Sequence, residues 1–247
     1  MTHLAYMTRK DWAQDATAMV PSSAHIRDWL SPGRYILAMP EVARFGDDPR
    51  SVNVETARFL FPNEQPPVVD ITDLTQLSGS EHANKFSVVV LHPHAVAACE
   101  ALGKVIRQDS LGHLFVMVWS PQDAIRTFLD ALGAVDLHTN ASVPRPDPLQ
   151  VAAAKLIVKE EYNGLSSGLG KDAAVQLLRA FIASGYALDE SSWLRAYFSA
   201  GGTFRHSEVL AKYIREMKAG VKHRAKSRYR ENIVQILRDQ VAKGEEV

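Results

Sequence analysis

Short apolar runs of strand length alternate with helix-like segments over the first half of the chain. Five runs, at residues 34–39, 67–71, 86–91, 113–119 and 134–138, are rich in β-branched and aliphatic side chains. Between them, three segments place apolar side chains three or four positions apart, which is the spacing of an amphipathic helix. These segments are residues 53–61, 94–107 and 121–132. The alternation predicts an α/β domain.

Two of the runs, SVVVL and LFVMVW, are apolar almost without interruption. Such continuity is typical of central strands that are covered on both faces, as in a parallel sheet with helices on either side. We therefore expect a Rossmann-like domain with a mostly parallel sheet of about five strands. No glycine-rich turn follows any of these runs, so the usual mode of dinucleotide binding is not expected. No cofactor is predicted.

The pattern changes near the proline cluster SVPRPDP, because X-Pro pairs favour extended backbone and interrupt helices. We place a boundary near residue 147, with a Rossmann-like domain over residues 1–147 and an all-α, basic domain over residues 148–247. Five amphipathic helices are predicted in the second domain. They cover residues 148–162, 171–184, a segment that Asp189 caps and Gly201 ends, 205–218, and 227–242.

The chain carries 28 Lys and Arg against 28 Asp and Glu, a formal net charge of zero. A neutral protein exerts no overall attraction on nucleic acid or on an anionic membrane, so any such attraction must be local. The charge is divided unevenly. Residues 1–145 hold 12 basic and 16 acidic side chains, whereas residues 146–247 hold 16 basic and 12 acidic ones.

The strongest local signal is basic, with eight Lys or Arg and one acid, Glu216, between residues 212 and 230. Several mobile or forked cations suffice to contact a phosphate backbone, so this tract predicts a DNA or RNA partner. The plainer interpretation is a solvated, charge-rich connection between helices. The predicted nucleic-acid-binding residues are Arg205, Lys212, Arg215, Lys218, Lys222, Arg224, Lys226, Arg228, Arg230 and Lys171.

Two further patterns bear on this prediction. The third and fourth helices, with Gly201 and Gly202 between them, have the layout of a helix-turn-helix, although any helical hairpin joined by glycines has the same layout. The stretch NGLSSGLGKD at 163–172 resembles a phosphate loop in composition only, because its spacing is one residue too long and Asp172 stands where Ser or Thr is needed. We expect an ordinary loop there, with Lys171 as a candidate phosphate contact.

Ligands of an open α/β sheet bind beyond the carboxyl ends of its strands, which makes the polar residues there a second candidate site. His92 and His94 could supply imidazoles for acid–base work or for a metal, although no third ligand is evident. Asp70 and Asp73 could hold Mg²⁺ for phosphoryl chemistry. Helix capping and loop solvation are the plainer roles. The predicted rim also includes Glu41, Thr72, Ser120, Gln122, Asp123, Asp136, His138 and Asn140.

Three functions therefore remain open. The first is nucleic-acid binding by the helical domain, with an unknown ligand for the α/β domain. The second is an enzyme acting on a nucleotide or a phosphorylated small molecule at the rim. The third is a non-catalytic scaffold, in which the basic tract meets the acidic half of a second copy in a homo-oligomer.

The remaining composition favours a cytoplasmic protein. A single cysteine, Cys99, cannot form an internal disulfide, which indicates a reducing compartment. The first fifteen residues contain no continuous apolar run as long as the hydrophobic region of a signal peptide, and no later stretch approaches about eighteen uninterrupted apolar residues. We therefore expect neither secretion nor a membrane span.

Overall fold

The computed structural model describes residues 2–30, 34–40, 42, 45, 51–77, 86–109 and 111–244. The chain forms two compact units, residues 1–143 and 144–247. The division lies a few residues before the boundary expected near residue 147. Each unit is described by itself below.

The described residues of the first unit form one sheet of seven strands in the order β3-β2-β4-β5-β1-β6-β7. Neighbouring strands are parallel throughout, except that β6 and β7 are antiparallel. The predicted α/β class and mostly parallel sheet are confirmed, but the expected count of about five strands is wrong. The strands are β1 (His3–Thr8), β2 (Arg34–Met39), β3 (Val68–Asp70), β4 (Phe86–Leu91), β5 (His113–Val118), β6 (Val135–Asp136) and β7 (Ala141–Ser142).

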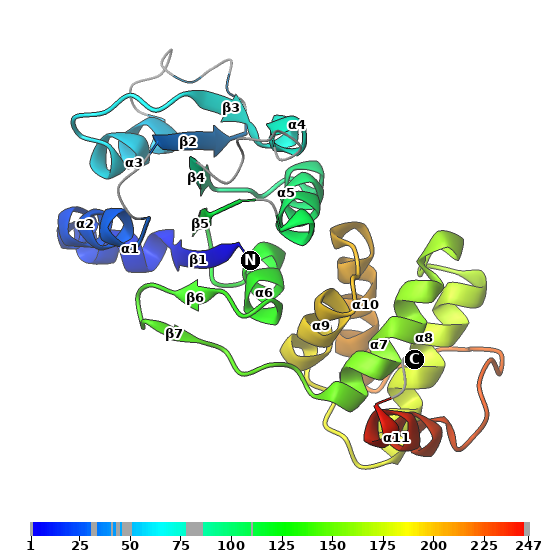
Figure 1. The fold of residues 1–247 in the computed structure, drawn as a ribbon. Coiled ribbons are helices and arrows are strands. Elements are labelled where there is room, and N and C mark those ends of the chain that lie inside the picture. The colour runs from blue at the N-terminus through cyan, green and yellow to red at the C-terminus, as the bar shows by residue number, and fades with distance from the viewer. Residues whose placement is uncertain are drawn as a thin grey trace. The chain divides into compact units, whose positions relative to one another are not determined.

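Helices cover both faces of this sheet (Figure 1). On one face lie α1 (Arg9–Thr17), α2 (Met19–Leu30) and α3 (Val52–Leu60). On the other lie α4 (Leu74–Leu77), α5 (Val96–Gln108) and α6 (Ala124–Ala131), with the 3₁₀ turn η2 (Ile71–Asp73) leading into α4. The double cover explains why the central strands are apolar at nearly every position.

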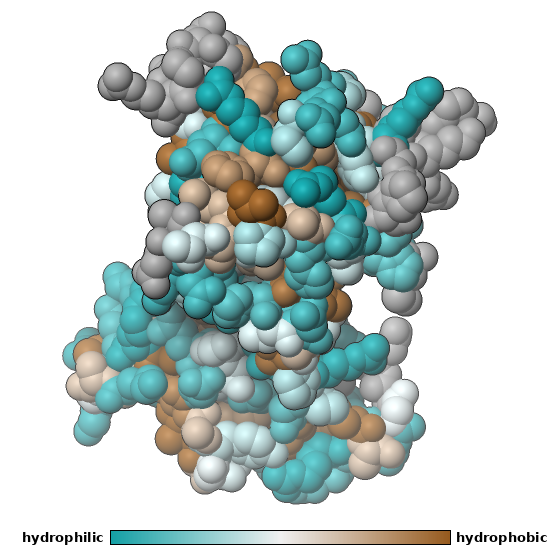
Figure 2. Space-filling view, turned by 90° about the vertical axis from the view of Figure 1, so that its left-hand side faces the viewer, coloured by the Kyte–Doolittle hydropathy of each residue, from teal (hydrophilic) through white to brown (hydrophobic). Residues whose placement is uncertain are grey.

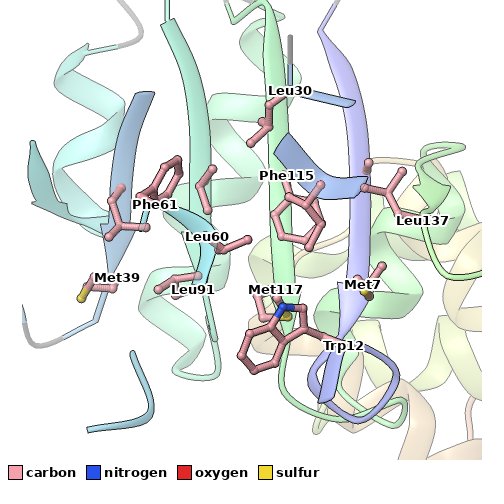
Figure 3. Close-up of a cluster of buried hydrophobic side chains, with 14 residues drawn as sticks. Met7, Trp12, Leu30, Met39, Leu60, Phe61, Leu91, Phe115, Met117 and Leu137 are labelled. Atoms are coloured by element: carbon pink, nitrogen blue, oxygen red, sulfur yellow. The ribbon is translucent and has the colours of Figure 1, made fainter. Parts of the chain in front are cut away.

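The core between the sheet and α1, α2 and α3 is built from alternate residues of the strands. Phe115 and Met117 of β5 lie beside Trp12 of α1 and Leu60 of α3 (Figure 3). Successive side chains of a strand point to opposite faces of the sheet. The strand residues between those of this core therefore pack against the helices on the other face. The Trp12 indole donates to Ser23 Oγ at 2.9 Å, which satisfies its only polar atom inside this core.

The strand order differs from the order 3-2-1-4-5-6 of the common dinucleotide-binding fold. Here β2 and β4 are neighbours, and the chain leaves their carboxyl ends in opposite directions. From β2 it runs through α3 to β3 at the edge, and from β4 it runs through α5 to β5 on the other side. Opposite connections leave a crevice beyond the carboxyl ends of the two strands, which is where open α/β sheets bind ligands.

The start of α6 differs from its prediction. The helix predicted over residues 121–132 begins only at Ala124, with Asp123 as its N-cap. Asp123 Oδ2 instead accepts the backbone N–H of Ser120 at 2.9 Å, and this bond holds residues 120–123 as a turn. The turn delays the helix and keeps Asp123 at the end of β5.

The second unit consists of helices in the described part of residues 144–247, as predicted. They are α7 (Pro148–Lys159), the 3₁₀ turn η4 (Glu161–Asn163), α8 (Gly168–Ala183), α9 (Glu190–Ser199), α10 (Phe204–Lys218) and α11 (Ile233–Lys243). Asp147 caps α7 and Asp189 caps α9 through their carboxylates. The last helix begins six residues later than the expected residue 227.

Apolar side chains that remain exposed are scattered over the face that Figure 2 shows. The face shown in Figure 2, on the side of α1, α2 and α3, is mostly hydrophilic and carries its hydrophobic side chains in separate patches. None of the helices in the described ranges combines the length and the apolarity that crossing a membrane requires.

Candidate functional site

The segment between α10 and α11 presents basic side chains at every second position. Lys222, Arg224, Lys226, Arg228 and Arg230 are exposed, and we name these five residues the basic strip. Between them, His223, Ala225 and Tyr229 are half-buried, whereas Ser227 is exposed. No helix or strand covers residues 219–232 of the described chain. The connection bends on its way from α10 to α11 (Figure 1), so the strip is a curved run of exposed cations.

Contacts from α8 hold the backbone of the strip in place. Gln176 Oε1 accepts the N–H groups of Arg228 and Tyr229 at 2.6 and 2.9 Å, and Gln176 Nε2 donates to the Tyr229 carbonyl at 2.7 Å. Arg179 donates to the carbonyl of His223. The Tyr229 carbonyl, which a helix from residue 227 would use for its own ladder, accepts from Gln176 instead, and this competition is consistent with the later start of α11 at Ile233.

The His223 side chain fastens the amino end of the strip. Its ring packs edge-to-face on Tyr213 of α10, with ring centroids 5.1 Å apart. Its Nε2 lies 3.3 Å from Glu216 Oε2, and only 9% of the side chain is exposed. Because His223 turns toward the helices, its neighbours Lys222 and Arg224 are directed to solvent.

Some predicted nucleic-acid-binding residues have carboxylate partners. Arg215 pairs with both Glu190 and Glu208, and Arg228 pairs with Glu160. Lys212 Nζ lies 3.9 Å from Glu216 Oε1 one turn along α10. Among the described residues, the others from this tract form no ion pair within 4.0 Å: Lys218, Lys222, Arg224, Lys226 and Arg230.

The helix-turn-helix pattern corresponds to α9 and α10, but it contributes fewer available cations. Arg215 lies on the outer surface of α10, where Glu190 of α9 engages it at 2.9 Å. Arg205 is exposed in the first turn of α10, whereas His206 is half-buried. Among the described residues, most of the positive charge without an ion pair therefore lies in the strip that follows α10, and Lys218 at the end of α10 adds to it.

Lys171 is half-buried in the first turn of α8, outside the basic strip. The glycines before it have a packing role. A Cβ atom on Gly170 would overlap the carbonyl oxygen of Gly164, so this close approach of loop and helix requires glycine. Residues 168–170 belong to α8 rather than to the predicted loop.

In the first unit, the crevice beyond β2 and β4 contains a cavity of about 410 Å³. Residues from four separate segments line it, and His92 and His94 are two of them. Among the residues that the structure describes, the lining is Pro40, Ser51, Val52, Asn53, His92, His94, Trp119 and Asp123. The structure thus brings together the two predicted histidines and Asp123 from the predicted rim.

His92 is held rigidly at the end of β4. Its backbone adopts a positive φ of 48°, and its N–H donates to the Met117 carbonyl of β5 at 2.9 Å. The ring is 4% exposed, its Nδ1 lies 2.7 Å from Asn53 Oδ1, and its Nε2 has no hydrogen-bond partner in the described ranges. Burial, followed by the charges of Arg9 and His94, lowers the pKa of His92 to about 3. The ring is neutral at physiological pH.

The predicted aspartates do not join this cavity. Asp70 Oδ1 accepts the Thr72 N–H at 2.9 Å and caps η2, which is the plainer role considered for such residues. Asp73 is the last residue of η2 and is exposed. Glu41 lies outside the described residues. Within the described ranges, no three His, Cys, Asp or Glu side chains are grouped as a metal would require.

Sequence reasoning missed three residues of this region. Asn53 was counted only as the start of a helix, and Trp119 only as the end of a strand. Arg9 follows β1, which was not recognised as a strand; its Cζ lies 5.8 Å from the centroid of the Trp119 ring. Recognition of β1 from the apolar run at residues 4–7 would have placed Arg9 at a carboxyl end.

No family model, curated protein or solved structure matches this chain. The function is therefore argued from its own residues.

Proposed function

We propose that the second unit binds the phosphate backbone of a nucleic acid through the basic strip. One observation carries this proposal. Four cations of the strip, Lys222, Arg224, Lys226 and Arg230, are exposed and form no ion pair among the described residues. A run of exposed cations suits a polyanion, whose charges repeat along its length.

The anchoring of the strip supports the proposal. An ordered row of cations loses less conformational freedom on binding than a mobile tail would. Gln176 and Arg179 already hold its backbone, and the half-buried His223 and Tyr229 face the helices. Little of the free energy of the phosphate contacts is then needed to order the strip, and the rest contributes to the affinity. Contacts of this kind carry no sequence preference of their own.

The test is a fluorescence-anisotropy titration of the full chain with labelled single- and double-stranded DNA and RNA at 50 and 200 mM salt. Four phosphate contacts predict that log K falls with log salt with a slope of about −3 to −4 for duplex DNA. The strip variant replaces Lys222, Arg224, Lys226 and Arg230 with Gln, and it should lose this binding. Because the four side chains are exposed, the variant should fold normally.

A matched control removes four exposed cations elsewhere, by replacing Lys10, Lys104, Lys159 and Arg238 with Gln. Its net charge equals that of the strip variant, but it should retain most of the affinity. An equal loss in both variants would show that total charge, rather than the strip, attracts the polyanion. Absence of salt-dependent binding in all four formats would overturn the proposal.

A further inference from the structure

Two helices of the first unit, α3 and α6, begin in the lining of the cavity beyond β2, β4 and β5, and a third, α5, begins two residues after His94 of the lining; among the described residues, no side chain caps any of the three. The N-cap residues are Ser51 for α3, Ala95 for α5 and Asp123 for α6. Ser51 and Asp123 line the cavity, and His94 of the lining directly precedes Ala95. The first N–H groups of a helix lack internal partners and carry partial positive charge, which favours an anion.

His92 is an independent sign of a ligand at the same cavity. It lines the cavity, it is 4% exposed, and its Nε2 has no partner among the described residues. Because Asn53 Oδ1 can only accept, Nδ1 carries the ring proton and Nε2 is left as an acceptor. A buried acceptor of this kind is normally satisfied; because Nε2 has almost no accessible surface in the ligand-free chain, a hydroxyl or N–H of a ligand would reach it after a local shift of the surrounding side chains.

Trp119 provides an aromatic surface beside this acceptor. It lines the cavity and is 50% exposed, which is unusual for so large an apolar side chain. The His92 ring meets it edge-to-face, with centroids 5.2 Å apart, and the guanidinium of Arg9 lies near the ring. A fixed and accessible indole ring of this kind is suited to stacking against a planar heterocycle.

Carboxylates near the cavity repel an anion from two of the three helix starts. Asp123 places a carboxylate at the start of α6, and Glu55 lies in the first turn of α3, where it pairs with Arg9 at 2.6 Å. The first turn of α5 contains no acid. An anion is therefore favoured at α5, whereas Asp123 suits a hydroxyl or N–H donor of the same ligand.

We propose that this cavity binds a nucleoside phosphate. Its phosphate contacts the open N–H groups at the start of α5, its sugar or base donates to His92 Nε2 and Asp123, and its base stacks on Trp119. The volume of about 410 Å³ lies within the range of small-molecule sites. A free phosphate or a free nucleoside would satisfy only part of the lining.

The proposal is tested by isothermal titration calorimetry of the full chain with AMP, GMP, CMP and UMP. Adenosine, ribose 5-phosphate and inorganic phosphate serve as partial ligands. At least one nucleotide should bind about tenfold more tightly than any partial ligand, because stacking on one aromatic ring alone contributes that much. If none of the four nucleotides binds at millimolar concentration, the proposal is wrong.

Ala95→Asp separates the phosphate contact from folding. An aspartate N-cap satisfies the open N–H groups of α5 itself, so it should raise the melting temperature while it weakens nucleotide binding at least tenfold. The control Asn63→Asp adds the same charge at an exposed position of the loop before β3 and should leave the affinity unchanged. Equal nucleotide affinity of Ala95→Asp and wild type would overturn the placement at α5.

Two further variants locate the base and separate this site from the basic strip. Trp119→Ala should weaken nucleotide binding about tenfold and leave the affinity for ribose 5-phosphate unchanged. The strip variant should bind the nucleotide as wild type does. Loss of nucleotide binding in the strip variant would show that the nucleotide occupies the strip, and the cavity would then hold no such ligand.

Discussion

His92 Nδ1 lies 2.7 Å from Asn53 Oδ1, a contact that joins the end of β4 to the first turn of α3. The two residues are 39 positions apart in the sequence and meet because β2 and β4 are neighbours in the sheet. The contact sets the tautomer of His92 and orients its ring beside Trp119. The pKa of His92 therefore differs between the folded and the unfolded chain.

The free energy of unfolding should decrease as the pH is lowered, because of His92. Its folded pKa of about 3 lies below the value near 6.5 of an unfolded histidine. Below pH 6.5 the unfolded chain therefore binds a proton that the folded chain does not. The free energy of unfolding should drop by up to about 1.4 kcal/mol per pH unit between pH 6.5 and 3, and the contribution is fully present above pH 6.5.

Urea unfolding of wild type and His92→Gln at pH 7, 6, 5 and 4 measures this slope. The variant should lose stability less steeply than wild type, because its remaining slope comes from the other titrating groups, including His113, whose pKa is also lowered by burial. Parallel loss in both proteins would mean that His92 is protonated in the folded state.

Cys99 should be unreactive in the folded protein. Its side chain is 5% exposed, and burial, with smaller contributions from Asp123 and Glu100, raises its pKa to about 12. The thiolate is the reactive species, so almost none is present at pH 8. A chromogenic disulfide reagent should label less than a tenth of the protein in an hour at pH 8, and all of it in guanidinium chloride. Rapid labelling without denaturant would contradict this burial.

Gly170→Ala should destabilise the second unit. The added methyl group would overlap the carbonyl oxygen of Gly164, a backbone atom that moves only with its loop. We expect a loss of about 1–3 kcal/mol in urea unfolding, the usual range for overpacking. Ser167→Ala in the same loop is the control, because Ser167 is exposed and makes no capping bond. Its effect should stay within about 0.5 kcal/mol.

Glu160→Gln should strengthen nucleic-acid binding if the basic strip is the interface. Arg228 is the strip residue whose charge is engaged, and Glu160 is its partner. Removal of that carboxylate frees one more cation, so the salt slope for duplex DNA should steepen by about 0.9. Glu64→Gln, an exposed change in the first unit, makes the same charge change without this effect. An unchanged slope for Glu160→Gln would place Arg228 outside the interface.

The sequence predicted the elements whose patterns are local. The continuous apolar runs of β4 and β5 indicated a parallel sheet covered on both faces, and Asp189 indicated the start of α9. It missed β1, because a six-residue strand at the amino end of a chain has few neighbours to confirm its period. It also extended α11 back to residue 227, because the side chain of Gln176 that competes for that backbone is 52 positions from Arg228.

For the candidate sites too, some features could be predicted from the sequence and others depend on tertiary contacts. The count and position of basic residues from 212 to 230 can be read from the chain, but which cations remain available depends on the approach of Glu160 and Glu190. His92 and His94 were visible as a pair of histidines after a strand. Their association with Asn53 and Trp119, and the exclusion of Asp70 and Asp73, followed from the strand order.

Periodicity, capping and composition are properties of neighbouring residues, so the sequence alone determined the α/β class, the helical second half and the uneven charge. Strand order, the pairing of distant charges and the orientation of the His92 ring depend on contacts between residues far apart in the chain. Many strand orders would bury the same apolar residues. Only the tertiary structure selects the one that brings three uncapped helices and two histidines to a single cavity.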